Sequence, residues 1–439
     1  MSSVDENIPE DWVETTLGEV GLEVLNGFAF KSKNFLNEEF ENVLPVLKIK
    51  NVANGDANLN DIVYHKFSDS LEKYRITKGD TLIALTGNHP FAKTQVVGGV
   101  SKYRINKDSL LNQRVAKIYS KPNSNLANEL IYYYFKWRVT KFYIGNQSSG
   151  SASQANISKT DLLNIPINLP PLPEQKAIAN ILKALDDKIE NLQAQNKTLE
   201  QTAKTIFKEW FGKYQNQNEV PLDMSLGSLD DFIGVLESGK RPKGGVGQFV
   251  EGIPSVGAEN VKNLGVYDYS KTKYVPEEFF NKMSSGIVKD YDILIYKDGG
   301  TPGTFIPHFT IVGEGFPFSK FCINEHVFRI QPKFKYQRFY LYSWLDSYYC
   351  RKLLQNIGGK AAIPGINSSD LREIEILIPS EESLKHFNKV VQPMYKKLLI
   401  NSRNIKTLQK TRDTLLPKLM SGALRVSEGG QIRGNEFKK

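Results

Sequence analysis

The sequence predicts an α+β protein with two globular modules of mixed α/β structure and two long helices that pair as an antiparallel coiled coil. Three observations lead to this prediction: an internal repeat, a heptad-like apolar seam in each repeat, and short β-rich runs before each seam. The expected segments are module 1 at residues 1–165, a central helix at 166–214, module 2 at 215–378, a distal helix at 379–421 and a disordered tail at 422–439.

The two halves of the chain repeat one another. Residues 157–162 are similar to residues 366–371, an offset of 366 − 157 = 209. The same offset places Pro170 on Pro379. Solenoid repeats are only about 20–50 residues long, so this period indicates a duplicated module with internal pseudo-twofold symmetry.

Each repeat ends in a run whose apolar residues recur in alternating steps of four and three. This spacing is typical of a coiled-coil seam. Pro173 suits a first helical turn, and Glu174 places negative charge near the helix N-terminus. The predicted seam residues are Ile178, Leu182, Leu185, Ile189, Leu192, Asn196, Leu199, Ile206 and Trp210 in the central helix, and Phe387, Val391, Met394, Leu398, Asn401, Ile405, Leu408, Leu415 and Leu419 in the distal helix.

The two seams are each other's nearest partners, and a whole module between them makes an antiparallel pairing natural. In the register in which paired residue numbers sum to 597, Asn196 meets Asn401. Two facing asparagines can hydrogen-bond to each other and fix the register. Arg412 also falls on the seam, so its side chain must either extend to solvent or pair with a nearby carboxylate, such as Asp186 or Glu190.

Short β-like runs, interrupted by glycine and asparagine, precede each seam. Strands are predicted at 43–49, 81–85, 96–100, 115–119, 293–296 and 327–330, helices at 126–142 and 339–353, a small polar loop at 145–154 and a linker at 212–221. The aromatic residues of the two predicted helices are expected to pack in the module cores rather than to stack on bases.

Composition limits the possible functions. The chain has 439 residues, enough for two domains, and its net charge of +9 permits a polyanionic partner. Cys322 and Cys350 lack metal-ligand spacing and are expected to be reduced thiols of a cytoplasmic protein. No apolar run approaches the ~20 residues of a membrane span, so no membrane association is expected.

These features resemble the specificity subunit of type I restriction–modification systems. In that family, two target-recognition domains alternate with two conserved helical regions. Residues 169–175, with the sequence LPPLPEQ, followed by Ile178 and Ala179, are similar to the central signature of the family. The distal copy at 378–382 departs from it, because it lacks the second proline and the glutamine. The resemblance covers nearly the whole chain.

The resemblance implies a subunit that recognises a bipartite target in double-stranded DNA, one half-site per domain. The partners it implies are two copies of the modification (methyltransferase) subunit, with restriction subunits in the full complex. S-adenosylmethionine, and ATP with Mg²⁺ for restriction, are expected on those partners, and no cofactor is expected on this chain. A helix from Ile178 to Trp210 would span roughly 48 Å, longer than one DNA turn of ~34 Å, so the paired helices could set the distance between half-sites.

Candidate DNA contacts are cations, amides and hydroxyls on predicted loops. Lysines would mostly meet phosphates, whereas arginine, asparagine and glutamine could reach base edges. The candidates in module 1 are Lys31, Lys33, Thr86, Asn88, Lys93, Thr94, Ser151, Ser153 and Gln154, and those in module 2 are Lys240, Arg241, Lys243, Lys297, Thr301 and Lys360. For any single residue, an ordinary solvated loop side chain is the competing interpretation.

No catalytic or metal-binding residues are predicted in this chain. Residues 234–240 have the spacing of a phosphate-binding loop, but Arg241 stands where such a loop has the Ser or Thr that binds magnesium. The five histidines lack ligand spacing. The main alternative is a non-catalytic coiled-coil adaptor that binds only proteins. A single-chain nuclease or methyltransferase is less well supported, because its motifs are missing.

Overall fold

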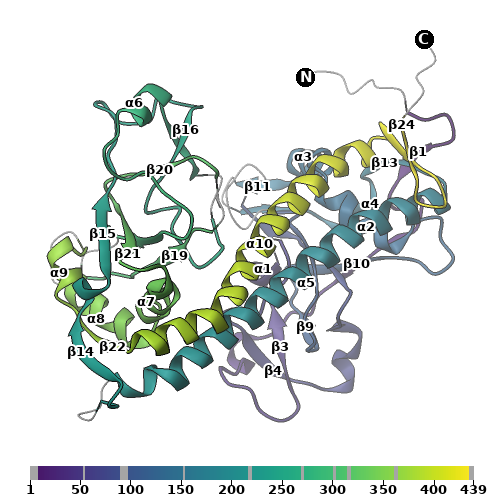
Figure 1. Cartoon of the computed structure of the whole chain (residues 1–439). Helices are drawn as coiled ribbons and strands as arrows, with labels where there is room; N and C mark the ends of the chain where they lie inside the picture. Colours follow the sequence, from purple (N-terminus) through teal and green to yellow (C-terminus); the bar gives the residue numbers. More distant parts are fainter. Residues whose placement is uncertain are drawn as a thin grey trace. The chain divides into compact units, whose positions relative to one another are not determined.

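The computed structural model describes residues 8–52, 55–88, 97–151, 154–215, 220–267, 271–299, 303–313, 318–359 and 364–434 (Figure 1). The chain divides into two compact units. Unit 1 contains the residues up to 187 and those from 409 onward, and unit 2 contains residues 188–408. Among the described residues, no helix combines the length and the apolar character that a membrane crossing requires.

Two helices are far longer than the others and lie side by side (Figure 1). They are α5 (Leu172–Trp210) and α10 (Glu381–Met420). Within unit 2, Asn196 bonds to Ser402, and the Trp210 and Phe387 rings lie 5.8 Å apart, so the two helices are antiparallel. Every predicted seam residue is buried or half-buried. The predicted pair of long helices is confirmed, and the burial of these residues agrees with their predicted place in the seam.

The two seam asparagines do not bond to each other, so that prediction is wrong. Asn196 Nδ2 donates to Ser402 Oγ at 3.1 Å, and Asn401 Nδ2 donates to Gln195 Oε1 at 3.4 Å. Helical side chains lean toward the N-terminus of their own helix. In an antiparallel pair two facing side chains therefore lean in opposite directions, and each meets a neighbour of its predicted partner. In the part of the chain that the structure describes, Oδ1 of each asparagine is buried and has no hydrogen-bond partner.

Replacing both seam asparagines with leucine should therefore raise the stability of the helix pair. Asn196→Leu/Asn401→Leu removes two buried acceptors that lack partners, and we expect a gain of about 1–2 kcal/mol. Ser402 keeps its bond to the Leu398 carbonyl oxygen. Urea denaturation of the full chain measures the change, and Asn404→Leu, at an exposed position of α10, is the control. A lower urea midpoint in the double variant would contradict the prediction.

Unit 1 contains a four-stranded antiparallel sheet of order β2-β10-β6-β8 and a four-stranded mixed sheet of order β4-β3-β9-β5. Its strands are β1 (Val13–Thr16), β2 (Leu22–Asn26), β3 (Val43–Leu47), β4 (Val63–Lys66), β5 (Arg75–Ile76), β6 (Thr81–Ala84), β7 (Thr86–Gly87), β8 (Val100–Lys102), β9 (Ser109–Leu111), β10 (Val115–Ser120), β11 (Ser149–Ser151), β12 (Gln154–Asn156), β13 (Pro166–Leu169), β23 (Leu424–Val426) and β24 (Ile432–Gly434). Its short helices are α1 (Ile49–Val52), α2 (Asn128–Lys136), α3 (Arg138–Gln147) and α4 (Lys159–Leu163).

Unit 2 repeats this topology. Its antiparallel sheet has the order β15-β21-β18-β19, and its mixed sheet has the order β17-β16-β20. Its strands are β14 (Met224–Ser228), β15 (Ile233–Ser238), β16 (Ile253–Val256), β17 (Lys273–Val275), β18 (Ile293–Tyr296), β19 (Phe309–Ile311), β20 (Cys322–Ile323), β21 (Val327–Pro332) and β22 (Glu375–Pro379). Its short helices are α6 (Glu277–Asn281), α7 (Arg338–Leu345), α8 (Tyr348–Gly358) and α9 (Ser368–Arg372).

The repeat extends to individual strand pairings. In each unit the mixed sheet contains one parallel pairing, β3 with β9 and β16 with β20. Helices α4 and α9 are related by the predicted offset of 209 residues. The predicted α+β fold with a duplicated module is confirmed.

Three local predictions were wrong. Each predicted long module helix is two helices: α2 and α3 are separated by Trp137, which has extended backbone (φ −63°, ψ 136°), and α8 begins anew at its N-cap, Ser347. Strands β11 and β12 lie in the region predicted as a polar loop and pair antiparallel, because Ser and Gln side chains permit backbone pairing without contributing to a core. The strand predicted at 96–100 is instead β8 (Val100–Lys102), because residues 97–98 form a turn in which Gly98 has φ +71°.

The predictions for the buried side chains are largely confirmed. The aromatic residues of α2 and α7 are in the core, although Tyr348 of α8 is 78% exposed. Both cysteines are buried and free. Burial raises the pKa of Cys322 to about 11, as expected of an unreactive core thiol.

The prediction of a disordered tail is wrong for residues 424–434, which form the antiparallel β23–β24 hairpin. Arg425 Nε and Nη2 each lie 2.8 Å from a carboxylate oxygen of Glu174, and Arg425 also pairs with Asp11. These hydrogen bonds raise the pKa of Arg425. A buried carboxylate at the start of α5 requires a charged partner, and the tail provides it.

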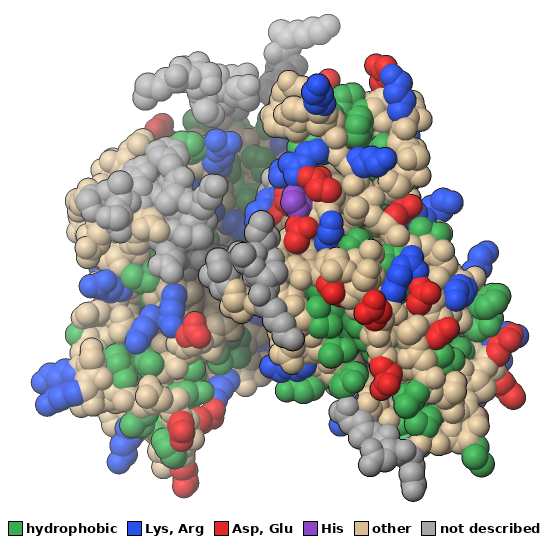
Figure 2. Space-filling model, turned by 90° about the vertical axis from the view of Figure 1, so that its left-hand side faces the viewer, with side chains coloured by type: hydrophobic (Ala, Val, Ile, Leu, Met, Phe, Trp, Pro, Cys, Tyr) green, Lys and Arg blue, Asp and Glu red, His purple; other side chains and the backbone are tan. Residues whose placement is uncertain are grey.

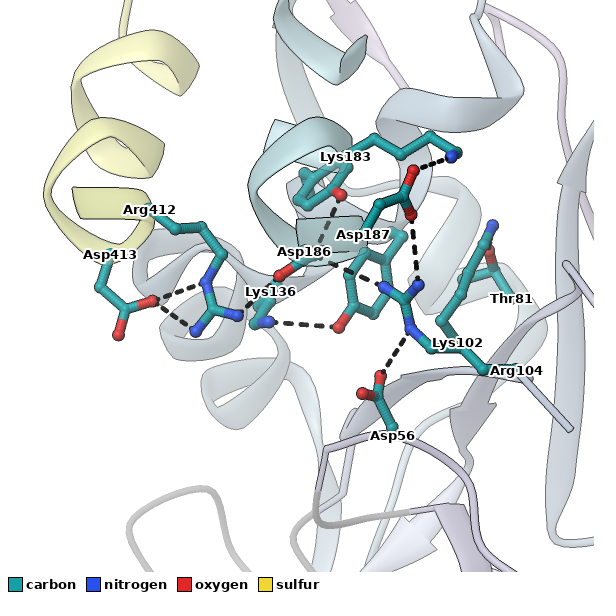
Figure 3. A network of polar contacts seen from close by, with 12 residues as sticks. Asp56, Thr81, Lys102, Arg104, Lys136, Lys183, Asp186, Asp187, Arg412 and Asp413 are labelled. Carbon is teal, nitrogen blue, oxygen red and sulfur yellow. Dashed lines mark hydrogen bonds and ion pairs between the residues drawn. The ribbon is translucent and has the colours of Figure 1, made fainter. Parts of the chain in front are cut away.

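A network of charges lies where α5 and α10 meet module 1 (Figure 3). Asp186 of α5 is buried, and Arg412 Nη1 of α10 donates to its Oδ1 at 2.7 Å. The Tyr133 hydroxyl donates to Asp186 Oδ2 at 3.0 Å, and Arg104 Nη2 lies 3.7 Å from the same oxygen. Although burial opposes the charged form, the bonds to Asp186 and Asp413 raise the pKa of Arg412. The prediction that Arg412 pairs with a carboxylate is confirmed.

Breaking this pair should destabilise unit 1. Arg412→Met leaves the buried Asp186 carboxylate without its closest cation, and we expect a loss of about 3 kcal/mol in denaturant unfolding. The double variant Asp186→Asn/Arg412→Met removes the buried charge as well. Its loss of unfolding free energy should be smaller than the sum of the losses measured for Asp186→Asn and Arg412→Met alone. Strictly additive losses would show that the two side chains are not coupled.

Candidate nucleic-acid interface

Four loops of unit 1 meet beside the end of its antiparallel sheet. The loop after β2 contacts the turn between β9 and β10, because Phe28 N donates to the Leu111 carbonyl oxygen at 2.8 Å. The loop after β6 contacts the same turn, since Leu85 N donates to the Arg114 carbonyl oxygen at 2.9 Å. Strand β12 completes the group by pairing with β7. Backbone hydrogen bonds therefore hold the four loops together.

The centre of this group is the turn at residues 112–114. Asn112 Oδ1 accepts a hydrogen bond from Arg114 N at 3.4 Å, and the Asn112 carbonyl oxygen accepts one from Val115 N at 2.9 Å. Asparagine commonly closes a turn in this way. The side chains of Gln113 and Arg114 are exposed. The turn therefore presents an amide and a guanidinium from a fixed backbone.

Unit 2 builds the same turn from residues 324–326. Asn324 Oδ1 accepts a hydrogen bond from His326 N at 3.0 Å. Lys297 N donates to the His326 carbonyl oxygen at 3.0 Å, as Leu85 N does to Arg114 in unit 1. The fourth segment is also repeated, because Asp298 pairs with Gly365. The two turns are related by an offset of 324 − 112 = 212 residues.

A glycine lets each turn approach the strand beside it. A Cβ on Gly27 would lie 2.2 Å from the Asn112 carbonyl oxygen, and one on Gly239 would lie 1.6 Å from the Ile323 carbonyl oxygen. Gly239 belongs to the segment that has the spacing of a phosphate-binding loop. Its role in this structure is close backbone contact.

Gly239→Ala should therefore displace the turn at 324–326 and destabilise unit 2 by about 2 kcal/mol or more, because the obstructing atoms belong to the backbone. Gly247→Ala is the matched control in the same loop region, since a Cβ there meets nothing within 4 Å. Thermal unfolding of both variants measures the difference. Equal midpoints would contradict the proposed close contact.

Charged side chains surround the unit 2 turn. Arg241 forms an ion pair with Glu325, and its Nη2 lies 2.8 Å from His326 Nε2. Because a guanidinium can only donate, Nε2 must accept and Nδ1 carries the proton. His326 Nδ1 then donates to Asp298 Oδ1 at 2.5 Å. This chain of contacts orients the guanidinium. Across the described residues, no group of three or more His, Cys, Asp or Glu side chains is placed to hold a metal ion.

The structure brings some of the predicted DNA contacts together. In unit 1, Thr86, Asn88 and Gln154 lie in the converging loops, with the backbone of Ser151 in β11 beside them. In unit 2, Arg241 and Lys297 lie in the corresponding loops. Lys31, Lys33, Lys240 and Lys243 are exposed in the loops that follow β2 and β15. Lys93, Thr94, Ser153, Thr301 and Lys360 lie outside the described residues. Contact of any of these residues with DNA stays a prediction.

Sequence reasoning missed the centre of each site, which is residues 113–114 and 325–326. A signal for it was present: Asn112 and Val115 match Asn324 and Val327 at an offset of 212. The offset of 209 that relates the other repeated segments does not align the two turns. The three-residue difference therefore hid them.

Among the described residues on the face drawn in Figure 2, basic side chains form no continuous area. Lys and Arg side chains alternate there with Asp and Glu. A phosphate-binding surface that depended on bulk positive charge would be dominated by cations.

The chain was compared with known proteins. The family model for the type I restriction modification DNA specificity domain matches residues 9–201 and again residues 221–410. The chain belongs to this specificity family. The two matches correspond to the two repeats, and the resemblance inferred from the LPPLPEQ segment is confirmed.

Curated relatives agree with this family assignment. The MjaIX specificity subunit of Methanocaldococcus jannaschii is 26% identical and covers 96% of this chain and 95% of its own length. The HindI specificity subunit of Haemophilus influenzae is 24% identical and covers 94% of this chain and 100% of its own length. The crystal structure of a type I S subunit from M. genitalium has a TM-score of 0.61 at 16% identity, covering 95% of this chain and 98% of that one. This likeness shows the shared fold.

Proposed function

We propose that the chain is the DNA specificity subunit of a type I restriction–modification complex and performs no catalysis itself. The observation that supports this best is the repeated loop group, in which one backbone scaffold presents different polar side chains in each unit. A protein that recognises two different half-sites needs this combination of constant framework and variable tips.

Methyltransferase and restriction subunits are the proposed partners. The related proteins are named specificity subunits of type I restriction enzymes, a name that implies catalysis elsewhere in the complex. S-adenosylmethionine, and ATP with Mg²⁺, would then bind those partners. Two modification subunits fit a chain whose units repeat one another.

Selection from random duplex DNA tests this function. Full-length chain, alone and co-purified with its modification subunits, should enrich a bipartite sequence with two specified clusters. Enrichment of no sequence, together with retained binding of the modification subunits, would favour the protein-only adaptor. Methylation by the chain alone would instead support an enzyme.

The salt dependence of binding should identify phosphate contacts. Lys240→Ala/Lys243→Ala should lower the slope of log K against log salt by roughly 2, since each phosphate contact contributes about 0.9. Lys282→Ala, at an exposed lysine paired with Glu278, is the matched control and should leave the slope unchanged. An unchanged slope in the double variant would remove both lysines from the interface.

The prediction that the helix pair sets the distance between half-sites stays a prediction. Duplicating residues 189–195 of α5 and residues 402–408 of α10 adds one heptad to each helix and keeps the seam in phase. Seven residues add about 10.5 Å, so the unspecified spacer should lengthen by roughly three base pairs. An enriched sequence with the original spacer would contradict this role of the helices.

A further inference from the structure

We propose that one arginine in each unit, Arg114 in unit 1 and Arg241 in unit 2, recognises a guanine in the half-site that its unit contacts. This inference rests on the proposed function and makes it specific. It assigns both half-sites a guanine and names the side chain that selects each one.

In unit 1 the arginine belongs to the turn itself. Arg114 is exposed, while its backbone is fixed on both sides: its carbonyl oxygen accepts from Leu85 N, and its N–H donates to Asn112 Oδ1. Within the described residues its guanidinium has no hydrogen-bond or ion-pair partner. With respect to the described residues, all five N–H donors are therefore free for a ligand. A fixed backbone with a free side-chain tip suits recognition rather than fold stabilisation.

In unit 2 the arginine comes from the neighbouring loop, and the turn holds it in place. His326 occupies the position of Arg114, and its Nε2 accepts from Arg241 Nη2 at 2.8 Å. Asp298 fixes the imidazole from its other side at 2.5 Å. Among the described residues, the contacts of Arg241 with His326 and with Glu325 involve Nη2. Donors therefore remain for a base edge, and His326 is a positioning residue.

The comparison of the two units separates framework from recognition. The asparagine that closes the turn, the glycine that permits its approach and the backbone bond from the loop after β6 or β18 occur in both units. Within the turn itself, the two residues after the asparagine differ, Gln113 and Arg114 in unit 1 against Glu325 and His326 in unit 2. Each unit nevertheless places one guanidinium at this turn, although it comes from a different loop.

Arginine chemistry identifies the base. A planar guanidinium can donate two parallel hydrogen bonds to O6 and N7 of guanine in the major groove, which is the commonest specific contact in protein–DNA complexes. Lysine carries the same charge but cannot form the planar pair. Loss of such a pair reduces discrimination against other bases roughly 5- to 150-fold.

Base preferences of single variants test the proposal. Arg114→Ala and Arg114→Lys in the full-length chain should each lose the guanine preference at one position of one half-site, by roughly 5- to 150-fold. Arg241→Ala and Arg241→Lys should do the same in the other half-site. Every other position should stay specified. The readout is the enrichment of each base in duplexes selected at constant salt.

Controls separate the possible outcomes. Arg138→Ala removes another exposed arginine of unit 1, outside the four loops, and should leave all preferences unchanged. His326→Ala should weaken the same guanine preference as Arg241→Ala, and His326→Gln should restore part of it, because glutamine can still accept from Arg241. Thermal unfolding of each variant excludes a general loss of structure.

Two results would overturn the proposal. Uniform loss of affinity at every position in the arginine variants would make both residues phosphate contacts. Unchanged preferences would remove them from the interface. If the unmodified chain enriches no sequence at all, the proposed DNA recognition itself fails, so the two failures are distinguishable.

Discussion

The rest of the structure depends on burial of the seam between α5 and α10. The main core of unit 1 contains Ile178 and Leu419, and the main core of unit 2 contains Phe207 and Phe387, so both helices contribute to both cores. Burying one such side chain is worth roughly 2 kcal/mol. Neither module therefore completes its main core without the helix pair. The buried charge beside this seam is paired, as the bond between Asp186 and Arg412 shows.

Duplication gives the chain one scaffold used twice. Corresponding strands, a turn-closing asparagine and a close-contact glycine place the same four loops together in each unit. The framework is formed by backbone hydrogen bonds, which tolerate many side chains. The tips of the loops can therefore differ without loss of the fold. This separation would allow one architecture to serve the two proposed half-sites, with a few residues at the loop tips selecting the bases.

The sequence predicted the features that depend on long periodic patterns. The seam of α5 and α10, the repeat and the core position of the aromatic residues all follow from spacing and apolar character. The predictions from the sequence were wrong where a single local interaction determines the structure. The break at Trp137 depends on one residue's backbone angles, and the pairing of Asn196 with Ser402 depends on how helical side chains lean. The hairpin of the tail forms where Arg425 meets Glu174, a contact between residues 251 positions apart. No local pattern could reveal it.

Methylation interference at guanine N7 tests the central claim most directly. A duplex enriched by the full-length chain is treated with dimethyl sulfate, and the bound and free fractions are compared base by base. Recognition of two half-sites from the major groove predicts interference in two separate clusters, with unaffected guanines between them. Interference in one continuous cluster, or binding that is insensitive to N7 methylation everywhere, would contradict it.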